Sequence, residues 1–152
     1  STLDILDIML RESMREEMGG VYGVSVYPEV VNYPKPEYGI TIMWSCDPEN
    51  VDDLVAIAEE QIALLKSEGP SLENIQKIQE QQRRQRETDL EENSWWKSAL
   101  SQYFKHGEDP MVILNYDSYV DGLSVESVQS AAQKFFGSGN RVKIVMYPEE
   151  AS

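Results

Sequence analysis

The sequence predicts an α+β fold, a two-layer sandwich in which helices pack on one face of a mainly antiparallel sheet. Helical and strand-like periodicities follow one another in the order helix, two strands, four helices, strand, without a repeat or a linker. The chain has 152 residues, of which 41% are hydrophobic, so it can bury a core of its own. Residues 1–152 are therefore expected to form a single domain.

The first three elements follow from residue spacing. Apolar side chains recur every three or four positions over residues 3–14, which predicts an amphipathic helix that ends at Gly19 or Gly20. Alternating residues over 22–27 predict a strand that Pro28 interrupts. A second strand over 38–46 has apolar residues on both sides, so we expect one face buried and the other half covered.

The helices that come next have clear start and stop signals. Asp47-Pro48 suits the start of a helix that ends at Gly69-Pro70, and Ser71 suits the N-cap of a long helix with few apolar residues. We expect that long helix to be exposed over much of its length. The apolar face of that helix returns at Trp95 and continues until Gly107. A further helix or turn of helix is predicted over residues 109–123, and the last helix begins at Ser124.

A closing strand is predicted over residues 141–148, with Val142, Ile144 and Met146 on one face. Three strands make a thin sheet for this many helices. Two explanations remain open. Either the chain is a fragment that lacks its first strands, or a second copy completes the sheet and gives a homodimer through an open sheet edge.

Charge and composition exclude several function classes. Acidic residues outnumber basic ones by 27 to 13, and the formal net charge is −14. Such a chain repels phosphate backbones and anionic lipids, so neither nucleic acid nor a membrane surface is an expected partner. The one basic cluster, residues 83–86, is followed by acids and is expected to be a solvated helix face.

The chain lacks a complete catalytic set of its own. His106 is the single histidine and Cys46 the single cysteine, so two-histidine zinc motifs and intrachain disulfides are both impossible. No serine lies in a G-x-S-x-G turn, and the glycines near residue 20 are not part of a phosphate-binding loop. We therefore expect no metal or cofactor to bind to this chain.

Arg15 and Tyr22 are the best candidate site residues, in the segment REEMGGVYGVSV. An arginine and a phenol that converge on one cleft can stabilise an oxyanion. The alternative is structural: a helix-terminal arginine that interacts with the helix dipole, and a strand tyrosine half-buried in the core.

Several segments, in this order, resemble the C-terminal type of domain in the pitrilysin/insulinase family of zinc metallopeptidases. They are LRESMREEMGGVYGVSV, YGITIMWSCDPENVDDL, GPSLENIQKIQ, ENSWWKSAL and RVKIVMYPE. In that family the zinc and its H-x-x-E-H motif lie in an N-terminal domain, and this chain has no such motif. The resemblance implies that Arg15 and Tyr22 contact the substrate and help to stabilise the tetrahedral intermediate. Asn93 and Trp96 match an N-x-x-W helix that we assign to packing.

The resemblance thus implies a zinc-free C-terminal portion of a larger metallopeptidase, inactive alone. Its expected partners are the N-terminal catalytic domain of the parent protein and an extended peptide substrate. The zinc is expected in that N-terminal domain. The alternative is a catalytically inactive structural or protein-binding module of the same fold.

Overall fold

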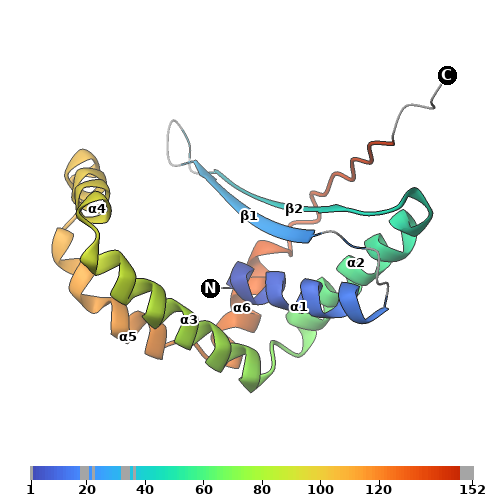
Figure 1. Ribbon diagram of the computed structural model, residues 1–152, viewed down its shortest axis with the longest axis horizontal. Helices are drawn as coiled ribbons and strands as arrows, with labels where there is room; N and C mark the ends of the chain where they lie inside the picture. Colours follow the sequence, from blue (N-terminus) through green and yellow to red (C-terminus); the bar gives the residue numbers. More distant parts are fainter. Residues whose placement is uncertain (1, 18–20, 22, 32–34, 36, 148–152) are drawn as a thin grey trace.

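The computed structural model describes residues 2–17, 21, 23–31, 35 and 37–147. Figure 1 shows these elements in chain order. They are α1 (Thr2–Glu17), β1 (Gly23–Val31), β2 (Glu37–Ser45), the 3-10 helix η1 (Pro48–Asn50), α2 (Val51–Ser67), α3 (Leu72–Glu91), α4 (Asn93–His106), the 3-10 helix η2 (Pro110–Asn115), α5 (Tyr116–Asp121) and α6 (Val125–Phe135).

Helix α1 lies at the centre of the core. It contacts β1, α2, α3 and α6, and it lies below the two strands in Figure 1. The predicted apolar stripe is confirmed, because Leu6, Leu10 and Met14 are completely buried. Ile5 and Met9 are buried as well, so the apolar face of α1 is wider than the three-to-four spacing indicates. The predicted stop at Gly19 or Gly20 lies outside the described residues.

The sheet is an antiparallel hairpin of β1 and β2, with Val24 opposite Trp44 and Val26 opposite Ile42. These four side chains point toward the helices and belong to the core or pack against it. The predicted α+β class, with helices packed against an antiparallel sheet, is confirmed. The other face of β2 is not half covered, since Met43 on that face is 56% exposed.

The prediction that Pro28 interrupts the first strand is wrong. β1 runs on to Val31, and Pro28 pairs with Ile40. A proline has no N–H to donate, but a strand with one unpaired side can hold it where that N–H would point away from the neighbouring strand. Within the described sheet β1 has such a side, because β2 is its only partner there.

The start signal at Asp47-Pro48 marks the short 3-10 helix η1, without a side-chain cap, and α2 follows from Val51. The signals at the turn between α2 and α3 are confirmed. Ser71 adopts an extended conformation, and its hydroxyl accepts a hydrogen bond from the Asn74 N–H at 3.1 Å. Gly69 has a φ of 77°, and a Cβ built there would approach Val125 Cγ1 to 2.8 Å. Glycine is therefore required for two reasons at the turn between α2 and α3.

The second half of α3 extends away from the core, and α4, η2 and α5 pack together beside it (Figure 1). Arg86 joins these elements, because its guanidinium lies 4.6 Å from the Trp95 ring centroid and 4.9 Å from that of Tyr116. It also donates a hydrogen bond to the Ile113 carbonyl at 2.8 Å. The expectation of a fully solvated basic cluster is therefore wrong for Arg86.

The helix predicted over residues 71–107 is two helices, because α3 ends at Glu91 and α4 begins at Asn93. Helix α4 packs less completely than its aromatic residues predict. Trp96 is half-buried and donates a hydrogen bond from Nε1 to the Leu90 carbonyl at 2.9 Å, while Asn93 is exposed. Phe104, near the end of the helix, is 72% exposed. The helix ends as predicted at Gly107, which adopts a left-handed conformation.

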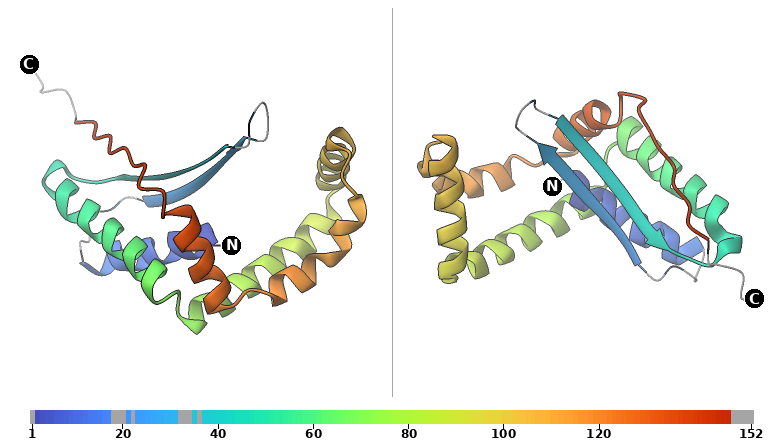
Figure 2. Two further views of the ribbon diagram at one scale, coloured as in Figure 1. Left: turned by 180° about the vertical axis from the view of Figure 1, so that it is seen from behind. Right: turned by 90° about the horizontal axis from the view of Figure 1, so that it is seen from above.

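The predicted closing strand is the main error. Residues 141–147 are irregular and pair with neither described strand. Arg141 and Lys143 instead form ion pairs with Glu59 and Asp52 of α2, at 3.0 and 3.1 Å. Figure 2 (right) shows this segment on the side of β2 that faces away from β1. Alternating apolar residues are typical of a strand, but a ladder also needs a partner within hydrogen-bonding distance.

A core substitution tests the central position of α1. Leu10→Ala should lower the free energy of unfolding by about 2–5 kcal/mol, because Leu10 is completely buried and a cavity would replace its side chain. Leu72→Ala is the matched control, since Leu72 is 70% exposed and should change stability by less than about 0.5 kcal/mol. Urea unfolding followed by circular dichroism measures both. Equal losses in the two variants would contradict the assignment of Leu10 to the core.

Candidate functional site

A cavity of about 310 Å³ lies where the end of α1 meets the start of β1. Helix α1 contributes Arg11, Met14 and Arg15. The chain that follows contributes Val21, Gly23, Val24 and Ser25. The candidate residue Arg15 thus borders a cavity at the helix-to-strand junction that the sequence singled out.

Burial of the opposite helix face orients the two arginines. Met14 is completely buried and Val24 is 3% exposed, so the core holds both the last turns of α1 and the beginning of β1. Arg11 and Arg15 are exposed and are four residues apart, which puts them on one face of the helix. Their Cβ atoms are therefore expected to be about 5–6 Å apart.

An ion pair within α1 restrains Arg11. Its Nε lies 2.9 Å from Asp7 Oδ2, one helical turn earlier. The Asp7 side chain is only 21% exposed, whereas that of Arg11 is 47% exposed. Because the pair uses Nε, both terminal NH2 groups of Arg11 remain available as donors to a ligand.

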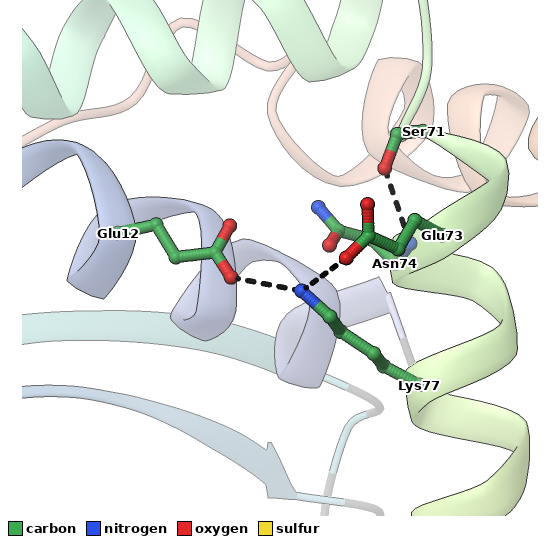
Figure 3. Close-up of polar contacts among 5 residues, drawn as sticks. All are labelled: Glu12, Ser71, Glu73, Asn74 and Lys77. Atoms are coloured by element: carbon green, nitrogen blue, oxygen red, sulfur yellow. Dashed lines mark hydrogen bonds and ion pairs between the residues drawn. The ribbon is translucent and has the colours of Figure 1, made fainter.

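Glu12, the acidic residue that follows Arg11, forms an ion pair with another helix. Lys77 of α3 lies between Glu12 of α1 and Glu73, with Nζ–Oε1 distances of 3.2 and 3.0 Å (Figure 3). The hydrogen bonds that Lys77 donates, to Glu73 first and then to Glu12, raise the pKa of its ammonium group. Glu12 is thus directed toward α3, and none of the described carboxylates forms an ion pair with Arg15.

Tyr22, the second candidate residue, lies outside the described residues. Its neighbours Val21 and Gly23 both line the cavity. The pairing of Arg15 with Tyr22 therefore stays a prediction. Sequence reasoning missed Arg11 and Asp7. The signal that could have found them is the four-residue spacing of Asp7, Arg11 and Arg15 along one helix.

The described part of the chain offers no group of three or more His, Cys, Asp or Glu side chains that could hold a metal ion. Cys46 is half-buried against the core, as expected for a structural thiol. In Figure 1 the end of β2, which Cys46 follows, lies far from α4, whose last residue is His106. A Cys–His dyad is therefore excluded. None of the described helices has the length and apolar character needed to span a membrane.

Comparison with known sequences gives a family and one relative. Residues 6–82 match the family model described as the peptidase M16 inactive domain. A protein of Arabidopsis thaliana described as a PQQL-like zinc protease is 35% identical over 60% of this chain. The match covers 10% of that relative, so the chain spans about a tenth of its length.

Solved structures share the fold. The periplasmic protease PqqL from Escherichia coli has a TM-score of 0.69 and 20% identity, over 90% of this chain and 15% of that chain. The peptidase M16 inactive domain from Pseudomonas fluorescens also has a TM-score of 0.69, with 15% identity, over 88% of this chain and 33% of that one. The ferredoxin protease FusC, solved in complex with Arabidopsis ferredoxin, has a TM-score of 0.69 and 20% identity, over 88% of this chain and 15% of that one.

The family model covers both α1, which carries Arg15, and the hairpin that borders the cavity. The resemblance to the C-terminal type of domain in the pitrilysin/insulinase family is thereby confirmed. This chain belongs to the peptidase M16 inactive-domain family.

Proposed function

We propose that this chain is the zinc-free C-terminal portion of a zinc metalloendopeptidase, where it binds substrate and stabilises the transition state of peptide hydrolysis. The observation that carries the proposal is the position of Arg15. It borders a cavity at the junction of α1 and β1, and no described carboxylate neutralises it.

The chemistry of the two candidate residues fits this role. A guanidinium can donate to the substrate carbonyl, and the Tyr22 phenol can donate a hydrogen bond to the oxygen that gains negative charge during hydrolysis. Such donors accelerate a reaction when they are held in place before the charge develops. The buried face of α1 supplies that rigidity on the Arg15 side of the cavity.

The metal belongs to another part of the parent protein in this proposal. The described residues do not fit a zinc ion, since they contain no three-ligand cluster. The names of the relatives support zinc in the parent, and the chain covers only 10–33% of the lengths of the proteins reported above. The N-terminal catalytic domain would hold the zinc, which activates water, and an extended peptide would bind between the two domains.

A structural module is the second candidate function. The family model is described as an inactive domain, which favours this second candidate. A domain without catalytic activity needs no role beyond binding a catalytic domain or a protein ligand. The two candidates differ in one respect: only the first requires Arg15 and Tyr22 for turnover.

Substitutions in the full-length protease separate the two candidates. Tyr22→Phe and Arg15→Gln should each lower kcat by about a hundredfold, because each removes a donor to the developing oxyanion. Peptide affinity, measured by fluorescence anisotropy with the zinc-free protein, should change much less for Tyr22→Phe. Arg84→Gln removes one positive charge from the exposed face of α3 and should retain wild-type turnover. Unchanged kcat in both site variants would favour the structural module.

The isolated chain tests the location of the metal. Zinc should leave its thermal unfolding midpoint unchanged, and the chain should not cleave peptides with or without zinc. The reason is that the described residues offer no set of zinc ligands. Peptide cleavage that a chelator abolishes would overturn the proposal, and so would a zinc-dependent rise in the midpoint.

A further inference from the structure

We propose that Arg11, one helical turn before Arg15, forms a subsite for a carboxylate of the bound peptide and so selects substrates with an acidic group beside the cleaved bond. This inference rests on the proposed function, because it assumes that a peptide lies across Arg15. It adds a substrate class and a specificity residue to that function.

The described lining of the cavity is positively charged. Arg11 and Arg15 are the only charged residues among those that line the described part of the cavity. The lining residues that remain are Met14, Val21, Gly23, Val24 and Ser25. A carboxylate that entered would therefore face two guanidinium groups, although the whole chain carries a net charge of −14. One of them, that of Arg11, already pairs with Asp7, which is not among the described lining residues.

Arg11 keeps hydrogen-bond donors that no described residue of the chain engages. Asp7 holds Arg11 through Nε, so the two terminal NH2 groups of Arg11 remain for a ligand. Glu12, the neighbouring acid, is engaged by Lys77. Asp7 thus acts as a positioning residue, and Lys77 keeps Glu12 from occupying the subsite.

The dimensions of the cavity indicate which carboxylates can reach the subsite. The volume of about 310 Å³ lies at the lower end of the range for ligand sites, about 300–1,000 Å³, so an acidic side chain fits within it. The two arginine Cβ atoms are about 5–6 Å apart, while an extended peptide advances about 3.3 Å per residue. In a peptide that runs along α1, an acidic group one or two residues from the carbonyl at Arg15 would therefore lie at Arg11.

Two sources can provide this carboxylate: the side chain of a Glu or Asp, or the free C-terminus of a short peptide. Both present the same planar pair of oxygens to a guanidinium. Peptides that differ only in Glu against Gln test the side chain. Peptides with a free or an amidated C-terminus two residues after the cleaved bond test the terminus.

The test measures kcat/KM of the full-length protease on each matched pair of peptides. The wild-type protein should prefer the carboxylate member of at least one pair by about five- to tenfold. Arg11→Gln should bring that ratio close to one, and Arg11→Lys should restore part of it. Arg11→Glu should invert the preference in favour of a Lys peptide, an outcome that a purely structural role of Arg11 would not give.

Two controls separate loss of charge from loss of structure. Arg84→Gln removes an exposed arginine on α3 and should leave the ratio as in the wild type. Asp7→Asn keeps both arginines but removes the ion pair that holds the Arg11 side chain. It should therefore weaken the preference for the carboxylate peptide. Unfolding midpoints of all variants identify any that fail to fold. If Arg11→Gln fails to fold, the peptide preference of Arg11→Lys is compared with that of the wild type instead.

The outcomes also separate this inference from the proposed function. If Arg15→Gln abolishes turnover while no peptide pair shows a preference that depends on Arg11, the inference falls and the proposed function stands. If Arg15→Gln leaves turnover intact, the proposed function falls. Peptide binding to the zinc-free protein, measured by fluorescence anisotropy, then tests the subsite without turnover. Equal affinity for the carboxylate and neutral peptides overturns the subsite.

Discussion

The burial of one face of α1 is the constraint on which the rest of the structure depends. This helix contacts β1, α2, α3 and α6, and its buried side chains form the middle of the apolar core. An amphipathic helix that buries one face necessarily exposes the other. The packing that buries Met14 therefore also determines that Arg11 and Arg15 point away from the core, toward the start of β1.

Local ion pairs keep a basic cavity open on an acidic protein. Opposite charges on neighbouring helical turns attract one another, and an unengaged acid four residues away would compete for an arginine. Here Asp7 binds only one edge of Arg11, and Lys77 draws Glu12 toward α3. The exposed Lys77–Glu12 pair contributes little to stability, since solvent screens both charges. The effect of the two ion pairs is on the direction of the side chains.

The helices beyond the core depend on a different kind of contact. The first turns of α3 bury Ile75 and Ile78, but its later turns carry few apolar residues. There the guanidinium of Arg86 lies over two aromatic rings and holds η2 and α5 beside α3 and α4. This part of the chain buries Ile113 and Val120, while it leaves Phe104 and Leu114 exposed.

Local chemistry made much of the fold predictable from the sequence. The stripe of α1, the Ser71 cap and the stop at Gly107 all depend on residues within one or two helical turns, and all were found as predicted. The same holds for the hairpin from β1 to β2. The family, too, followed from motifs in the sequence alone.

The errors arose where a residue depends on a distant partner. Residues 141–147 have the alternation of a strand but lie along α2 without a ladder, and Pro28 fits inside a strand because that strand has an unpaired side. The sequence by itself determined which faces of the helices are apolar and where most helices begin and end. Only the tertiary structure decided that the start of β1 encloses a cavity with Arg11 and Arg15 of α1 and that Lys77 engages Glu12. Such contacts join residues on different elements, and no local periodicity encodes the distance between them.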